Sequence, residues 1–192
     1  MGLASLFLFL ALLFGSDVKS ATGREYYSVL TVDNGQSWGS WGSQAFCPAG
    51  SYATGFSLKV EYYQEGGDDT AVNGIRLHCT QPGRDDSTRV ESTSGTWGEW
   101  TRTQFCPFGS LKSFQLNVEP QHDGDNTAVN NIRFKCSGIT MLEGYGMDFG
   151  DWGRWSSECS YGGICGIQTR VEPYQWNIDN TGLNDVQFFC CK

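Results

Sequence analysis

Hydrophobic and polar residues alternate with a period of two in three well-separated stretches of the chain. Apolar side chains occupy every second position, with polar or charged residues between them, in residues 56–62, 114–119 and 167–172. Because successive side chains of a β-strand point to opposite faces, this alternation predicts strands with one face in a core and the other toward water. No segment after residue 20 has a convincing helical period, so we expect an all-β protein.

A second predicted strand follows each stretch after a polar loop. These second strands span residues 75–79, 132–136 and 186–190, and each ends on a cysteine. The loops are rich in Gly, Asp and Asn, which supply the positive φ angles and local hydrogen bonds of turns. One asparagine recurs just before each second strand, as Asn73, Asn130 and Asn184. We expect its amide to bond the backbone of a turn or bulge, with ligand contact as the alternative.

The three stretches belong to three copies of one sequence unit. Each copy contains a Trp-Gly-x-Trp motif, whose second Trp is residue 41, 100 or 155, so the spacing is 59 and then 55 residues. A lone sheet of this size cannot bury its apolar face. We therefore expect three sheets, one from each copy, to face one another across an approximate three-fold axis. The copies span about 28–82, 83–139 and 140–192 of a single domain over residues 21–192.

The six tryptophans of these motifs are predicted to fill the core between the sheets, with stacking against a sugar as the alternative. A buried aromatic side chain removes about 150–250 Å² from water, so six indole rings would supply much of that core. Trp176 lies outside the repeated motif. We interpret it as a candidate for an exposed aromatic platform.

Residues 1–20 are predicted to be a signal peptide rather than part of this domain. Residues 3–14 form an uncharged apolar run that is too short to span a bilayer, and a polar segment with small residues follows it. No second apolar stretch occurs, so we expect a secreted, extracellular protein with no membrane span.

Eight cysteines and only two histidines favour disulfides over a metal site. Equivalent positions in the copies predict one bridge in each sheet, and two further cysteines remain for a fourth bridge. The expected pairs are Cys47–Cys79, Cys106–Cys136, Cys159–Cys190 and Cys165–Cys191. Cys190 and Cys191 could exchange partners, because neighbouring strand residues point to opposite faces. We expect neither a metal nor a cofactor.

The net charge of −8 argues against nucleic acid as a partner and against adsorption to an anionic membrane surface. It favours cationic partners, including basic secreted proteins.

The repeated motifs resemble the vitelline membrane outer layer protein 1 family over nearly the whole chain after the leader. The resemblance is carried by the three Trp-Gly-x-Trp segments, the two Phe-Cys-Pro segments, the two Thr-Ala-Val-Asn-x-Ile-Arg segments and the terminal Phe-Phe-Cys-Cys. It implies a β-prism of three Greek-key antiparallel sheets, as in jacalin-like lectins and the middle domain of insecticidal δ-endotoxins. It also implies a place in an extracellular coat such as the vitelline membrane, and a lysozyme-like transferase activity on N-acetylglucosamine oligomers.

Three hypotheses for function follow from these residues. Weak binding of N-acetylglucosamine-type glycans would use loop carboxylates and amides with one aromatic face: Asp68, Asp69, Asn73, Asp123, Asp125, Asn126, Asn130, Trp176, Asp179 and Asn180. Glycosyl transfer needs two carboxyl groups, and Glu61, Glu119 and Glu172 occupy one position in the three copies. If these glutamates converge, at least one should titrate high; if they diverge, they are solvated. The third hypothesis is a purely structural coat protein that binds other coat proteins.

Overall fold

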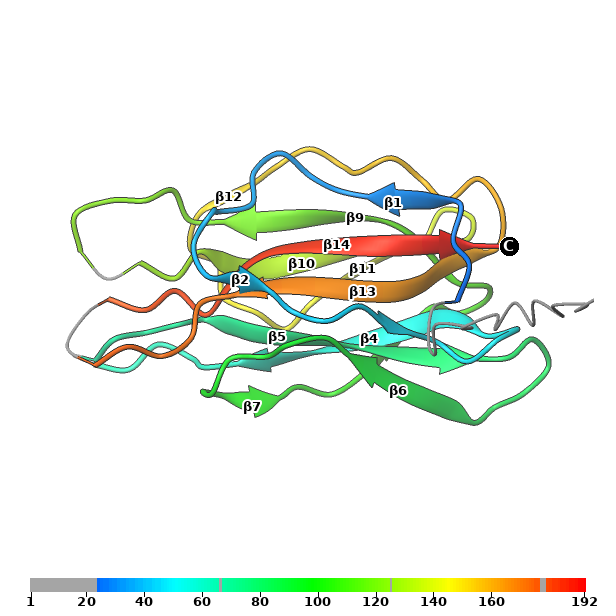
Figure 1. Cartoon of the computed structure of the whole chain (residues 1–192), viewed down its shortest axis with the longest axis horizontal. Coiled ribbons are helices and arrows are strands. Elements are labelled where there is room, and N and C mark those ends of the chain that lie inside the picture. The colour runs from blue at the N-terminus through cyan, green and yellow to red at the C-terminus, as the bar shows by residue number, and fades with distance from the viewer. Residues whose placement is uncertain (1–23, 66, 125, 177–178) are drawn as a thin grey trace, which may run out of the picture.

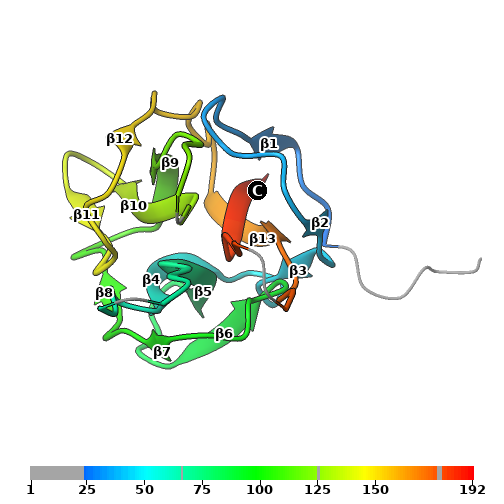
Figure 2. The same ribbon diagram turned by 90° about the vertical axis from the view of Figure 1, so that its left-hand side faces the viewer.

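The computed structural model describes residues 24–65, 67–124, 126–176 and 179–192. The predicted signal peptide lies outside the described residues. Within them the chain forms strands and loops but no α-helix, and so no helix that could cross a membrane. The strands form three antiparallel sheets whose inner faces meet around a common axis, as the end-on view of Figure 2 shows. The predicted all-β prism is therefore confirmed.

Each sheet is built around one of the long hairpins that the alternating pattern predicted. The first sheet has the order β6 (Ser87–Glu91), β5 (Val72–Thr80), β4 (Tyr52–Val60) and β7 (Glu99–Trp100), with β8 (Gln104–Phe105) also pairing with β4. The second has the order β11 (Met141–Glu143), β10 (Val129–Cys136), β9 (Leu111–Val118) and β12 (Asp151–Trp152). The third has the order β1 (Ser28–Leu30), β14 (Leu183–Cys191), β13 (Gly163–Val171) and β2 (Ser40–Trp41), with β3 (Ala45–Phe46) also pairing with β13. In the first two sheets the fourth strand returns beside the first, which is the Greek-key order.

The prediction that each copy forms its own sheet is wrong. The strand that contains the Trp-Gly-x-Trp motif pairs with the hairpin of a neighbouring copy: β7 with β4, β12 with β9, and β2 with β13. The N-terminal strands β1, β2 and β3 thereby complete the sheet of the C-terminal hairpin, and Figure 2 shows them on the same side of the prism as β13. The three copies are interleaved rather than placed side by side.

The motif of the third copy is also shifted by three residues from its predicted position. Gly39, Gly98 and Gly150 all have a positive φ, between 72° and 83°, and each lies against the backbone at the end of the first hairpin strand. An added Cβ would come within 2.4 Å of that backbone, so the close approach requires glycine. The structural counterpart of Trp41 and Trp100 is therefore Trp152, and not Trp155.

The motif tryptophans do not form the core, which corrects the sequence-based prediction. Trp38, Trp41 and Trp97 are 40–47% exposed, and none of the tryptophans in the described ranges is fully buried. Cationic side chains cover three other rings on the outer surface: Arg76 over Trp100 at 3.8 Å, Arg133 over Trp152 at 3.9 Å and Lys135 over Trp155 at 4.6 Å. These tryptophans lie on short edge strands or next to them, away from the axis where the inner faces meet.

Phenylalanines fill the centre of the prism instead. Phe56, Phe114, Phe134 and Phe188 are at most 1% exposed, and they come from all three sheets. The Phe134 ring centroid lies 4.7 Å from that of Phe56 and 5.2 Å from that of Phe188, and Phe114 lies 4.8 Å from Phe188. A single aromatic cluster therefore joins the three inner faces.

The four disulfides join the expected pairs. Three follow the repeat positions, Cys47–Cys79, Cys106–Cys136 and Cys159–Cys190, and the two remaining cysteines form Cys165–Cys191, so Cys190 and Cys191 do not exchange partners. We expected each of the first three bridges to lie within one sheet, and this expectation is wrong. The first cysteine of each pair lies along a neighbouring sheet, so the bridge connects two sheets. Backbone N–H groups show this placement: Cys47 donates to Cys165 O, Cys106 to Thr54 O and Cys159 to Lys112 O. These three bridges link third to first, first to second and second to third sheet, which closes a covalent ring. The fourth joins β13 to β14.

Candidate functional site

The three hairpin loops gather at one end of the prism. They span residues 61–71, 119–128 and 172–182, and they project at the left of Figure 1 and toward the viewer in Figure 2. The chain terminus at Lys192 lies at the opposite end. Among the described residues, the candidate glycan-binding residues lie in these loops, except Asn73 and Asn130, which lie at the starts of β5 and β10.

Each loop closes through the same hydrogen bonds. In the first loop the Glu61 carboxylate accepts hydrogen bonds from Thr70 N at 3.2 Å and from Thr70 Oγ1 at 2.6 Å. Asn73 Nδ2 donates to Thr70 Oγ1 at 2.6 Å, and Ala71 between them has a φ of 48°. The other two loops repeat these contacts with Glu119, Thr127 and Asn130, and with Glu172, Thr181 and Asn184. The recurring Asn therefore serves the turn, as the first of our two interpretations stated.

The three equivalent glutamates line different surfaces. Glu61 lines a first cleft, Glu172 lines a second, and Glu119 lines neither. Burial raises the pKa of Glu119, but hydrogen bonds from Thr127 and His122 outweigh that effect and leave its pKa below the usual value. His122 Nε2 lies 3.1 Å from Glu119 Oε1, and this contact raises the pKa of His122. Glu119 is thus held as an anion, which is the opposite of a glutamate that titrates high.

Aspartates hold the loops to one another. Asp68 of the first loop accepts hydrogen bonds from Asn180 N at 2.9 Å and Asn180 Nδ2 at 2.6 Å in the third loop. Asp179 of the third loop accepts in the same way from Asn126 N at 2.9 Å and Asn126 Nδ2 at 2.7 Å in the second. Each carboxylate keeps further lone pairs that can accept from a ligand. The loop end is therefore a linked surface rather than three separate loops.

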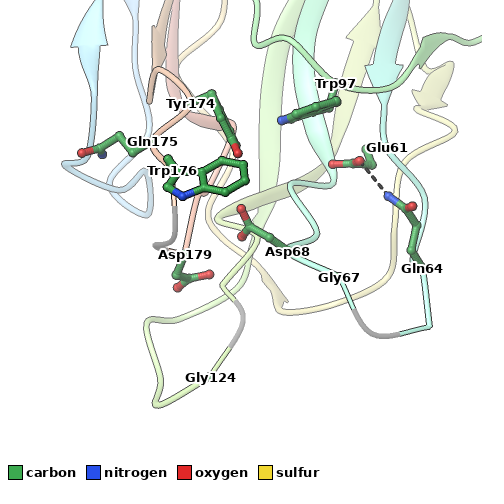
Figure 3. A pocket seen from close by; sticks show the side chains of 10 residues that line it. All are labelled: Glu61, Gln64, Gly67, Asp68, Trp97, Gly124, Tyr174, Gln175, Trp176 and Asp179. Atoms are coloured by element: carbon green, nitrogen blue, oxygen red, sulfur yellow. Dashed lines mark hydrogen bonds between the residues drawn. The ribbon is translucent and has the colours of Figure 1, made fainter.

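Cleft 1 lies between the first and third loops and has a volume of about 810 Å³. Three aromatic side chains line it, and the Trp97 and Tyr174 rings meet edge to face with centroids 5.6 Å apart. Figure 3 shows Tyr174 and Trp176 on one side, Trp97 and Glu61 on the other, and the Asp68 carboxylate between them. The full lining is Glu61, Gln64, Gly67, Asp68, Trp97, Gly124, Tyr174, Gln175, Trp176 and Asp179.

Cleft 2 adjoins cleft 1 and has a volume of about 540 Å³. Gln175 and Asp179 line both clefts. Its lining is Gln36, Trp38, Gly39, Gln121, Asn126, Glu172, Pro173, Gln175, Asp179 and Thr181. Like cleft 1, it combines an indole ring with carboxylates and amides.

The structure brings together only part of the set named from the sequence. Asp68, Trp176 and Asp179 line cleft 1, and Asn126 lines cleft 2. Four others are buried within the turns: Asp69, Asn73, Asn130 and Asn180. Asp123 is exposed outside both clefts, and Asp125 lies outside the described residues.

Sequence reasoning missed Trp97, Tyr174, Gln64 and Gln175 as cleft residues. Trp97 was assigned to the core with the rest of its motif. Tyr174 could have been identified from the sequence, because Tyr174 and Trp176 are two residues apart in one polar loop and so form a pair of aromatic residues outside the core pattern. Among the described residues, no group of three His, Cys, Asp or Glu side chains is arranged to hold a metal ion.

His78 and Asp185 also have displaced pKa values and lie outside the two clefts. Burial lowers the pKa of His78 to about 4, with help from Arg89 and Arg76, and its Nε2 lies 3.1 Å from Thr103 Oγ1. Burial raises the pKa of Asp185 to about 6, although its carboxylate accepts a hydrogen bond from Val186 N at 2.8 Å. These groups make the stability of the prism depend on pH.

Asp185→Asn is expected to stabilise the protein at pH 7.5 by about 1–2 kcal/mol, after allowance for the partial exposure of this group. The folded state binds the Asp185 proton more tightly than the unfolded state, so its contribution is lost as pH rises from about 4 to about 6. Asn131, the counterpart in the second copy, makes the same bond to the next backbone N–H at 2.9 Å. Urea denaturation should show that the variant has a larger free energy of unfolding than wild type at pH 7.5, and that the two values are similar at pH 4.

The lowered pKa of His78 also changes stability with pH, but in the opposite direction. Because His78 is present in both proteins, its effect cancels when the two free energies of unfolding are subtracted. Asn131→Asp is the matched control, and it should introduce a loss of stability with the same pH dependence. An Asp185→Asn variant no more stable than wild type at pH 7.5 would contradict the assignment.

The family model "Vitelline membrane outer layer protein I (VOMI)" matches residues 28–192 of this chain. The "Vitelline membrane outer layer protein 1 homolog" of Mus musculus is 49% identical over 170 residues, which cover 86% of this chain and 84% of the relative. The human protein of the same name is 48% identical over 171 residues, which cover 87% and 84%.

Solved lectin structures have the same fold at low sequence identity. A mannose-binding lectin from champedak superposes with a TM-score of 0.55 at 12% identity, covering 89% of this chain and all of its own. An artocarpin–mannopentose complex gives 0.54 at 15% identity, covering 87% of this chain and 98% of its own. At such identity the likeness concerns the fold alone.

Proposed function

Because this chain belongs to the vitelline membrane outer layer protein I family, we propose that it is a secreted component of an extracellular coat that binds glycans in cleft 1. N-acetylglucosamine-type oligosaccharides are the proposed ligands. The net charge of −8 favours basic coat proteins as further partners.

The composition of cleft 1 is the observation that carries this proposal. Trp97, Tyr174 and Trp176 offer aromatic faces, and Trp176 is 77% exposed. Aromatic rings pack against the apolar C–H faces of sugars, while carboxylates and amides bond their hydroxyl groups. Glu61, Asp68 and Gln64 supply such acceptors and donors at the same cleft. Small-ligand sites commonly combine a mainly apolar lining with a few convergent polar groups.

The prism architecture accommodates glycans in other proteins. One solved structure with this fold is named as a mannose-binding lectin, and another is a complex with mannopentose. This likeness supports the proposal by analogy of fold, and the choice of sugar rests on the family resemblance.

Trp176→Ala is expected to weaken binding of N-acetylchitotriose about five- to ten-fold, which corresponds to about 1–1.4 kcal/mol for one lost stacking contact. The measurement is isothermal titration calorimetry with the purified full-length secreted protein. Trp155→Ala is the matched control, because this indole lies on the outer surface under Lys135 and outside both clefts. Equal losses in the two variants would contradict a site in cleft 1, and no binding to the wild type would leave the purely structural coat role.

The same samples test glycosyl transfer, the alternative function. A retaining or inverting enzyme needs one carboxylic acid that is protonated at the working pH, beside a second carboxylate. Glu61 and Glu172 belong to different hairpin loops, and the pKa of Glu119 is lowered rather than raised. We therefore expect mass spectrometry after incubation with N-acetylchitohexaose to show no longer products. Longer products that disappear in Glu61→Gln would favour the enzyme.

A further inference from the structure

We propose that cleft 1 and cleft 2 are two parts of one groove, which binds a single glycan chain long enough to occupy both. This inference rests on the proposed glycan binding in cleft 1, and it assigns cleft 2 as a second subsite.

The two clefts meet at a common wall. Gln175 and Asp179 line both of them. In Figure 3 the Tyr174 and Trp176 rings point into cleft 1, whereas the Gln175 side chain between them in sequence points away toward the opposite side of the loop. Asp179 also holds Asn126, a residue of cleft 2, through two hydrogen bonds of 2.9 and 2.7 Å. The two clefts therefore lie on either side of the segment that carries Gln175 and Asp179, and a ligand that occupies both must cross this segment.

Cleft 2 repeats in the third sheet what cleft 1 has in the first. Trp97 precedes β7 and Trp38 precedes β2, and a glycine with positive φ follows each indole. The two rings are exposed to similar extents, 43% and 47%. Glu61 and Glu172 occupy the same place in their hairpin loops and make the same contacts with a threonine. Each cleft thus contains the indole and the glutamate of equivalent positions in the repeat.

The third equivalent position differs. Phe149 stands where the other sheets have Trp38 and Trp97, and it packs edge to face on Tyr63 at 6.4 Å. Neither Phe149 nor Glu119 lines cleft 1 or cleft 2. The pseudo-three-fold repeat therefore gives two adjoining subsites and one equivalent position outside them. Replacement of Phe149 at that third position is a matched control for replacement of Trp38 or Trp97.

Two linked subsites predict a dependence of affinity on chain length. Once one part of a glycan occupies cleft 1, the remainder is held at high effective concentration beside cleft 2. A disaccharide fills only one subsite and gains nothing from the other. The affinity should therefore rise when the oligomer becomes long enough to reach Trp38, and then stay constant.

The test is a calorimetric series with N-acetylglucosamine oligomers of two to eight units against wild type, Trp38→Ala, Trp97→Ala and Phe149→Ala. We expect wild type to bind the longest oligomer at least about ten-fold more tightly than the disaccharide, with one chain per protein. Trp38→Ala should remove this gain, so that the longest oligomer binds the variant no more tightly than the disaccharide does. Trp97→Ala should weaken every length, and Phe149→Ala should weaken none.

Several results would overturn the groove while leaving cleft 1 as a glycan site. These are an affinity independent of length, a long oligomer unaffected by Trp38→Ala, or two short-chain molecules bound per protein with no gain for the long chain. Absence of binding at every length would instead overturn the proposed function, and the groove with it. Thermal unfolding of each variant verifies that the three aromatic replacements leave the prism folded.

Discussion

Phe134→Ala is expected to lower the free energy of unfolding by about 3–5 kcal/mol, the usual cost of removing a large aromatic side chain from a packed core. Phe134 is fully buried, and its ring contacts Phe56, Phe114 and Phe188 from all three sheets. The cavity would open where the inner faces meet, so no single sheet could collapse to fill it. Urea denaturation monitored by circular dichroism gives the measurement.

Trp100→Ala is the comparison that makes this prediction discriminating. The Trp100 ring is only partly buried and lies under Arg76, so its removal should cost less than about 2 kcal/mol. A Trp100 variant that loses as much stability as the Phe134 variant would show that the core has been assigned to the wrong aromatic residues. Should Phe134→Ala fail to fold, Phe134→Leu should still cost about 1–2 kcal/mol.

Removal of the Cys159–Cys190 disulfide by a double alanine replacement should cost about 3–4 kcal/mol, because the bridge closes a long loop in the unfolded chain. The two cysteines are 31 residues apart, and their bond is the link between the second and third sheets. Thermal and urea unfolding of the variant under oxidising conditions would measure the loss.

The Cys165–Cys191 bridge is the matched control. Its cysteines are 26 residues apart, so the loop-closure contribution is nearly the same, but both lie in strands that already pair with each other. Hydrogen exchange should therefore show new opening between the second and third sheets only in the Cys159–Cys190 variant. Identical exchange patterns in the two variants would contradict a role for the covalent ring in holding the sheets together.

The sequence predicted the long hairpins and their loops because their signals are local. Phe56, Leu58 and Val60 alternate with polar residues, and each such strand leads into a turn rich in Asp, Asn and Gly. The equivalent positions of cysteines in the copies gave the disulfide pairs. The family resemblance gave the prism and its Greek-key order.

The exchange of strands between copies could not be predicted in the same way. The strand at Glu99–Trp100 is two residues long, which is too short for any hydrophobic period. It pairs with β4 because the backbone at Gly98 packs closely against the end of that strand and because the sheets bring the two segments together. In the third copy the sequence motif does not mark the equivalent structural position. Trp152-Gly153-Arg154-Trp155 matches the motif, but the glycine with positive φ is Gly150.

The candidate site was predicted only in part for a related reason. Tryptophan is strongly apolar, so Trp97 was placed in the core, although edge strands leave such rings partly exposed. Conversely, Asp69 and Asn180 have the chemistry of ligand-binding side chains but are buried within the turns. Residue type led to the loop end of the molecule, whereas burial separates the residues that line the clefts from those that hold the turns.

The placement of β1, β2 and β3 beside the last hairpin has a consequence for biosynthesis. The first strands of the chain have no partner until β13 and β14 (residues 163–191) have emerged from the ribosome. During translation the emerging amino-terminal strands therefore expose unpaired edges that a neighbouring nascent chain could capture. The prism can therefore close only after β13 and β14 have been synthesised. A chain truncated before this hairpin would leave β1, β2 and β3 without the strands that they pair with.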